Sequence, residues 1–157
     1  MQLKFIKNYF CKKLKNISKM KTSLRTKFIQ NMSFETVIGD HKLVMDAAVE
    51  NGGENLGPRP KALLLASLAG CTGMDVVSLL KKMRVDFDNF YMDVDGDVTD
   101  EHPKHFTKMH VKYYFKGKDL QLDKIEKAVS MSQDKYCGVS ATFKLGMPVT
   151  WEIIVVE

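Results

Sequence analysis

The sequence predicts an α+β protein in which antiparallel strands wrap one long central helix. Two observations carry this prediction. Residues 61–84 are apolar or small on most helical faces through their first half, and the segments on either side alternate apolar and polar residues. A helix that is apolar all round is covered on most sides, and alternation with a period of two is typical of half-buried strands. The expected order is β-β-β-α-β-β-α-β, which favours antiparallel sheet with helices packed on it.

The chain is expected to begin with a basic extension and two or three strands. Residues 1–19 contain lysines and no acid, and they lack the apolar core of a secretory signal. We interpret them as a disordered extension; a membrane-surface helix is the lesser alternative. Residues 20–157 then form a single domain. Because the extension carries the excess of the +5 formal charge, we expect no nucleic-acid partner. Short alternating runs predict strands at 22–30, 33–38 and 41–46.

A loop rich in Gly, Asn and Pro leads into the central helix. Residues 50–60 form this loop, and Pro60 suits a helix entry. Asp75 and Lys81 interrupt the apolar run, so we expect neither a membrane span nor stable membrane association. Gly70 and Gly73 each cost about 1 kcal/mol inside a helix. They predict the close approach of another backbone beside Cys71.

The C-terminal half is expected to add strands, a second helix and a closing strand. Alternation predicts strands at 87–101 and 107–115, and the apolar spacing predicts a helix over 123–136. Cys137 follows the last turn of that helix. Residues 149–156 form the closing strand.

Two cysteines carry the candidate chemistry. Cys71 lies in the middle of the central helix and Cys137 at the end of the second one, and each taken alone is typical of a small buried hydrophobic residue. A helix C-terminus disfavours a thiolate, and an ionised Asp75 one turn after Cys71 would raise the pKa of its thiol. As a pair, they could form a peroxidatic and resolving couple, provided that their Cα atoms come within about 7 Å. The simplest alternative is that both cysteines are buried and inert.

Composition excludes several other classes of protein. Three cysteines, one of them in the extension, make no disulfide framework, and free thiols with ten methionines fit the reducing cytoplasm. Nucleotide-binding and hydrolase motifs are absent from the sequence. Since the four histidines have no metal-ligand spacing, neither a metal nor a cofactor is expected.

Three segments together resemble one known family. GPRPKALLLASLAGCTGMDVVSLLKKMR at 57–84, HPKHFTKMHVKYYFKGKDL at 102–120 and AVSMSQDKYCGVSATF at 128–143 are similar to the OsmC/Ohr family of osmotically induced and organic-hydroperoxide-resistance proteins, in its YhfA-like branch. The resemblance runs from about residue 20 to the C-terminus. It implies an OsmC-like fold and an intertwined homodimer, with two antiparallel sheets around the central helices and active sites at the interface.

The resemblance also implies an activity and its residues. Members of the family reduce small organic hydroperoxides with thiols, and a dithiol reductant restores the enzyme. The helix cysteine, matched here by Cys71, becomes a sulfenic acid that the second cysteine, matched by Cys137, resolves. We therefore expect a thiol peroxidase.

Two departures from the family pattern leave a second function open. Hydroperoxidase members carry a glutamate shortly after the proline that opens the helix, where this chain has Lys61 and Ala62. They also use an arginine from the N-terminal part, for which Arg25 and Arg59 are candidates by position. The alternative is a catalytically divergent dimeric module that binds an apolar or thiol ligand at the subunit interface.

Overall fold

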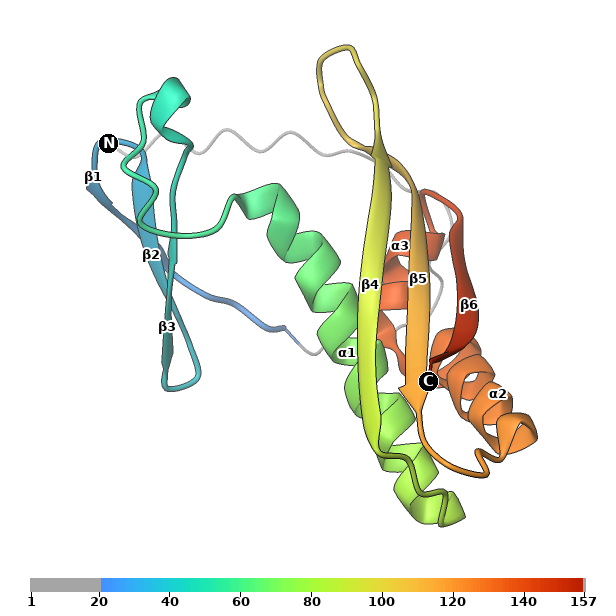
Figure 1. The fold of residues 1–157 in the computed structure, drawn as a ribbon. Coiled ribbons are helices and arrows are strands. Elements are labelled where there is room, and N and C mark those ends of the chain that lie inside the picture. Colours follow the sequence, from blue (N-terminus) through green and yellow to red (C-terminus); the bar gives the residue numbers. More distant parts are fainter. Residues whose placement is uncertain (1–20, 157) are drawn as a thin grey trace.

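The computed structural model describes residues 21–156, which form two small sheets and one long helix (Figure 1). The predicted disorder of residues 1–19 lies outside this range. The first sheet has the order β1-β2-β3, with antiparallel neighbours joined by tight turns. Its strands are β1 Thr26–Gln30, β2 Ser33–Ile38 and β3 His41–Met45, and the 3-10 turn η1 Val49–Asn51 follows.

The central helix is confirmed almost to the residue. Helix α1 spans Pro60–Met83, with proline at its first position, and Arg84 ends it in the left-handed region with φ 55°. Leu68, Val76 and Leu80 are fully buried on its core side. Among the described residues, α1 is the one helix that is long and apolar enough to cross a membrane, and it is the partly buried core helix of this fold.

The second sheet packs on α1 and contains one pairing that the sequence did not predict. Strands β4 Asn89–Val98 and β5 Phe106–Lys116 are antiparallel, but β6 Val149–Val156 runs parallel to β5. The α+β class is confirmed, while the purely antiparallel pairing is not. The reason is the connection between β5 and β6, which passes through helices, and a parallel neighbour requires such a crossover.

That crossover holds three helical segments where the sequence predicted one. Helix α2 spans Leu122–Met131, a wider π-type turn η2 spans Ser132–Tyr136, and a short helix α3 spans Gly138–Lys144. The Cys137 N–H donates to Ser132 O at 2.8 Å and closes the π turn. The predicted helix over 123–136 is therefore correct in position, but the chain re-enters a helix immediately after Cys137.

The first sheet stands apart from the rest of the fold (Figure 1). Its apolar side chains remain exposed: Phe28 is 62% accessible, and Phe34, Val37 and Ile38 are also exposed. A sheet normally buries one face against another layer. Within residues 21–156, this sheet does not have such a layer.

Candidate functional site

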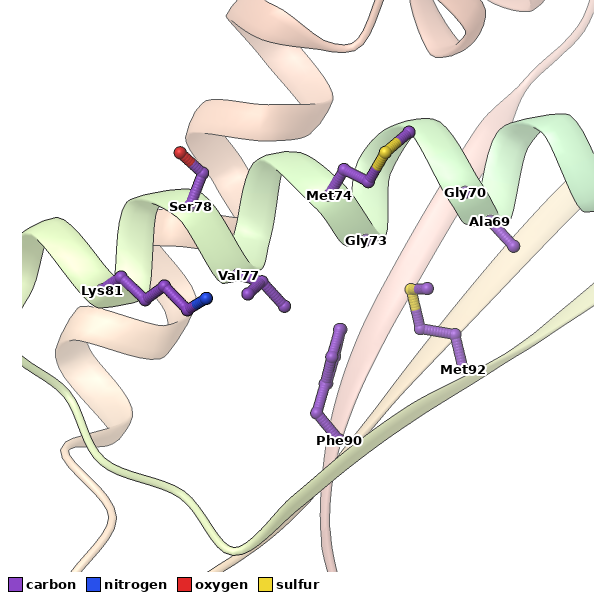
Figure 2. A pocket seen from close by; sticks show the side chains of 9 residues that line it. All are labelled: Ala69, Gly70, Gly73, Met74, Val77, Ser78, Lys81, Phe90 and Met92. Atoms are coloured by element: carbon purple, nitrogen blue, oxygen red, sulfur yellow. The ribbon is translucent and has the colours of Figure 1, made fainter. Parts of the chain in front are cut away.

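Beside Cys71, the surface of α1 borders an open groove. Figure 2 shows Phe90 and Met92 of β4 facing α1 across it. The groove has a volume of about 560 Å³, and α1 contributes mostly small or apolar side chains: Ala69, Gly70, Gly73, Met74, Val77, Ser78 and Lys81. At about 100° per residue, Met74 and Ser78 neighbour Cys71 on the helix surface, but Cys71 itself does not line the groove.

The two helix glycines serve this groove in different ways. A Cβ at Gly73 would collide with the Met92 side chain, whereas a Cβ at Gly70 would meet nothing within 4 Å. The expected close approach of a backbone beside Cys71 is therefore not found within the described chain. Gly73 makes room for a side chain of β4, and Gly70 faces open space.

The structure brings Cys71, Asp75 and Cys137 together. The two sulfur atoms and a carboxylate oxygen of Asp75 all lie within 4.8 Å of one another. Cys71 and Asp75 are four residues apart on α1 and so share one face of that helix. Cys137 reaches them from the junction of η2 and α3, with its side chain 2% exposed, while Cys71 is only partly buried.

The sequence predicted that Cys137 lies at a helix C-terminus, but the structure also places it at the start of a further helix. It is the N-cap of α3, and its Sγ accepts a hydrogen bond from the Ser140 N–H at 3.3 Å. Helix N-terminal N–H groups stabilise negative charge. The thiol thus lies between the end of one helical segment and the start of another.

Burial nevertheless keeps the Cys137 proton in place. Desolvation, followed by the hydrogen bond with Cys71, raises the pKa of Cys137 to about 11, against a smaller lowering by the Ser140 N–H. A neutral thiol at this position can donate to a neighbouring sulfur. Of the two cysteines, Cys71 is the more exposed to solvent.

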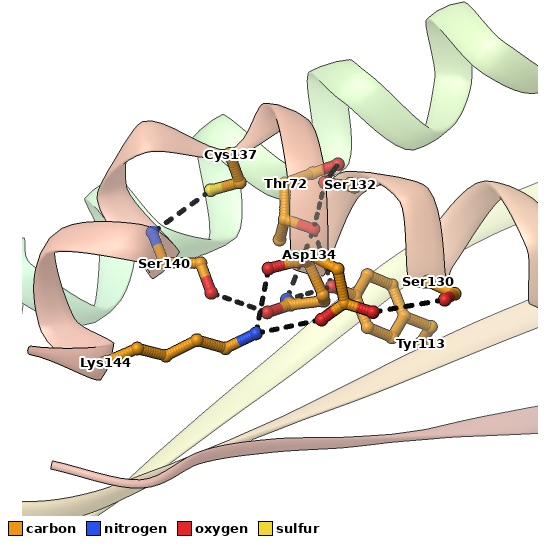
Figure 3. Close-up of polar contacts among 9 residues, drawn as sticks. Thr72, Tyr113, Ser130, Ser132, Asp134, Cys137, Ser140 and Lys144 are labelled. Carbon is orange, nitrogen blue, oxygen red and sulfur yellow. Dashed lines mark hydrogen bonds and ion pairs between the residues drawn. The ribbon is translucent and has the colours of Figure 1, made fainter.

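A buried polar network fixes the segment around Cys137 (Figure 3). Gln133 lies at its centre and is 2% exposed. Its Nε2 donates to Tyr113 Oη at 2.7 Å, and its Oε1 accepts from Ser140 Oγ at 2.6 Å. Thr72 Oγ1 lies 2.6 Å from Tyr113 Oη and 2.9 Å from Ser132 Oγ. These bonds join α1, β5, η2 and α3, so they set where Cys137 stands relative to Cys71.

The same network orients Asp75. Ser132 Oγ donates to Asp75 Oδ2 at 3.1 Å. At the outer edge of the network, Lys144 Nζ donates to Gln133 O at 2.8 Å and pairs with Asp134 at 3.2 Å. The hydrogen-bond partner of Asp75 is thus a neutral hydroxyl. The charged Lys144 instead contacts Gln133 O and Asp134.

Neither candidate arginine is recorded in contact with the thiols of the described chain. Arg59 caps α1, and its guanidinium donates to Gly57 O and Asn55 Oδ1, both at 2.8 Å. Arg25 is exposed ahead of β1, and its carbonyl accepts from Thr36 Oγ1.

The loop that holds Arg59 is organised by Asp46. The N–H groups of Leu56, Glu54 and Ala47, together with the Arg59 charge, lower the pKa of Asp46 against the effect of burial.

The sequence indicated Cys71, Asp75 and Cys137 as candidates, but not the polar residues that hydrogen-bond around them. Thr72, Tyr113, Ser132, Gln133 and Ser140 are ordinary polar residues on separate elements, and no spacing connects them. A Ser or Asp at position 137 would have signalled the start of a helix. Cysteine is not a usual N-cap residue, so the sequence did not signal the start of α3.

The fold and the site together define an α+β protein whose pair of thiols lies between a long central helix and a crossover helix. The chain belongs to the OsmC family, because the model of OsmC-like proteins matches residues 52–152. Among individual relatives, it is similar to Protein YhfA of Escherichia coli strain K12, with 30% identity over 128 residues that cover 80% of this chain and 92% of YhfA. The resemblance read from the sequence is confirmed.

Solved structures show the same fold. A hypothetical protein from Aquifex aeolicus has a TM-score of 0.73 and 28% identity, with 88% of this chain and 100% of that one covered. An organic hydroperoxide resistance protein OsmC from Legionella pneumophila has a TM-score of 0.64 and 19% identity, with 86% and 97% covered. The second likeness shows the fold alone.

Proposed function

We propose that this protein is a cytoplasmic, homodimeric thiol peroxidase that reduces organic hydroperoxides with a dithiol reductant. The observation that carries the proposal is the approach of Cys71 and Cys137, whose sulfur atoms lie within 4.8 Å although 65 residues separate them in the chain. The family supports it, since it includes proteins named for organic hydroperoxide resistance. The apolar groove along α1, lined by the helical neighbours Gly70 and Met74 of Cys71, favours an apolar peroxide over hydrogen peroxide.

In this proposal Cys71 is the nucleophile. Its thiolate attacks one peroxide oxygen, the O–O bond breaks, and the leaving alkoxide takes a proton to become the alcohol. Cys71 is left as a sulfenic acid. Cys137 then attacks the sulfenic sulfur, an S–S bond forms, and the hydroxyl leaves as water. The dithiol returns two electrons and two protons through thiol–disulfide exchange.

Asp75 and the network act on the second step. The Cys137 thiol must lose its proton before it attacks, and the Asp75 carboxylate lies within 4.8 Å of both sulfur atoms. We assign Asp75 as the group that accepts this proton. Arg59 is held in its loop, so a cation that activates Cys71 would come from Arg25 or from the second subunit.

Two uncovered apolar surfaces support the proposed homodimer. The first sheet exposes Phe28, Val37 and Ile38, and α1 exposes Met74, which is 71% accessible at the groove. Contiguous apolar surface of this kind marks an interface. A second copy whose first sheet covers α1 of its partner would bury both surfaces and close the groove beside Cys71.

The oligomeric state is directly measurable. Light scattering of the purified chain should give twice the 17.9 kDa mass of the monomer. Met74→Glu places a charge in the groove and should shift the protein towards the monomer, whereas Lys127→Glu on the exposed face of α2 should not. A wild-type protein that runs as a monomer at micromolar concentration would refute the dimer.

Stoichiometric oxidation tests the thiol chemistry. One equivalent of cumene hydroperoxide added to the reduced protein should yield cumyl alcohol and an intramolecular disulfide, with the loss of two hydrogen atoms from the intact mass. Peptide mapping should place the bond between Cys71 and Cys137. The sulfur atoms, which lie within 4.8 Å of each other, must close to about 2.05 Å. Two thiols that still titrate after the peroxide is added would contradict the proposal.

The binding-module alternative rests on a specific observation. Burial raises the pKa of the Cys137 thiol, and Arg59 is engaged elsewhere. Within residues 21–156 no lysine or arginine hydrogen-bonds to either thiol, and α1 borders a groove of about 560 Å³. A ligand that co-purifies in native mass spectrometry, with thiols inert to cumene hydroperoxide, would favour this alternative.

A further inference from the structure

We propose that Cys71, Asp75 and Cys137 form a zinc site, with the two sulfur atoms and one carboxylate oxygen as ligands. The sequence pattern predicted no metal site, because the ligands come from two distant segments. Two lie at i and i+4 on α1, and the third is at the N-cap of α3. The inference rests on their geometry, on the groups that hydrogen-bond to them, and on their combined charge.

The distances suit a tetrahedral ion. With Zn–S bonds near 2.3 Å and Zn–O bonds near 2.0–2.2 Å, ligand atoms around a tetrahedral zinc lie roughly 3.5–3.8 Å apart. The three ligand atoms here lie within 4.8 Å of one another. A contraction of about 1 Å is within reach of side-chain rotation, and one coordination position remains for water.

The ligand set selects zinc over harder cations. Two thiolates with one carboxylate favour a borderline-soft divalent ion, whereas magnesium and calcium take oxygen ligands. When both thiols are deprotonated, the cluster carries three negative charges, and the recorded partner of Asp75 is the neutral Ser132 hydroxyl. A divalent ion would offset most of that charge. Binding sends the two thiol protons to the buffer and needs no oxidant or reductant.

The surrounding hydrogen bonds resemble those of a built metal site. The Ser140 N–H donates to Cys137 Sγ at 3.3 Å, and Ser132 Oγ donates to Asp75 Oδ2 at 3.1 Å. Both donors belong to the buried network around Gln133 and are themselves fully buried. Such partners fix the orientation of metal ligands, and they leave Asp75 Oδ1 available to the ion.

Zinc and peroxide would compete for the same sulfur atoms. A thiolate bound to zinc shares with the metal the electron pair with which it would attack the peroxide, and a disulfide has no thiolate to offer to zinc. Zinc would therefore hold the pair in its reduced, inactive form. This consequence rests on the proposed function, whereas the binding of the metal does not.

Cobalt(II) replaces zinc with a visible spectrum and gives the test. The full chain carrying Cys11→Ser, so that no third thiol contributes, is reduced and titrated anaerobically with Co²⁺. We expect tetrahedral visible bands and a thiolate charge-transfer band that saturate at one equivalent per chain and disappear on addition of Zn²⁺. Asp75→Asn should weaken binding roughly tenfold or more, since even outer partners of a metal ligand are worth 10- to 100-fold.

Matched variants make the result decisive. Cys71→Ser and Cys137→Ser should each lower the charge-transfer intensity by about half, while Glu126→Gln, which removes an exposed carboxylate of α2, should bind as the parent does. An octahedral spectrum at saturating Co²⁺, or a charge-transfer band unchanged by Cys137→Ser, would overturn the inference. Because the titration contains no peroxide, a protein that binds no Co²⁺ but still forms the disulfide loses the zinc site and keeps the proposed function.

Discussion

Replacement of Cys71 by serine is expected to abolish the reduction of cumene hydroperoxide. Serine preserves the shape of the side chain, but its hydroxyl does not accept a peroxide oxygen and form an oxidised intermediate as sulfur does. Loss of a catalytic nucleophile typically lowers turnover by several orders of magnitude, so we expect a loss on the order of 10³-fold or more. The measurement is peroxide consumption with dithiothreitol as the reductant.

Two companion variants separate the roles of the thiols. Cys137→Ser should still form a sulfenic acid on Cys71, which dimedone traps, but it should turn over slowly because the intramolecular disulfide is lost. Cys11→Ser removes a thiol that lies outside the described residues and should keep the parent rate. Wild-type turnover by Cys71→Ser would remove Cys71 from the mechanism and leave the binding module as the better account.

Gln133→Leu is expected to cause the largest loss of stability among conservative changes at the site. Leucine has a similar volume, but it leaves Ser140 Oγ without its 2.6 Å acceptor and takes one donor from Tyr113 Oη. A buried polar group without a partner costs about 1–3 kcal/mol, so we expect unfolding to be easier by about 2–3 kcal/mol. Urea denaturation followed by circular dichroism measures it.

An exposed glutamine supplies the control. Gln121 caps α2 through its backbone without a side-chain cap bond, so Gln121→Leu should change stability by less than about 0.5 kcal/mol. Gln133 accepts a hydrogen bond from the Ser140 side chain, and the Ser140 N–H donates to Cys137 Sγ. Gln133→Leu should therefore also slow disulfide formation in the folded protein. Equal stability of the Gln133→Leu and Gln121→Leu variants would show that the network contributes little.

The central helix could be predicted because its signals are local. Proline at its entry, lysines in its last turn and apolar residues on most faces are properties of 24 consecutive residues. Strands β2 and β3 and the helical character of 123–136 followed from periodicity in the same way. The proximity of Cys71 and Asp75 could also be predicted, since residues four apart on a helix share a face.

The remainder depended on segments far apart in the chain. The parallel pairing of β6 follows from a crossover whose path no local pattern specifies. The π turn η2 and the start of α3 depend on Gln133, Ser132 and Ser140 finding Tyr113 and Thr72 across the core. The sequence by itself determined which residues could react and which helix would hold the first of them. Only the tertiary structure decided that Cys137 meets Cys71, because that meeting is fixed by buried hydrogen bonds between four separate elements.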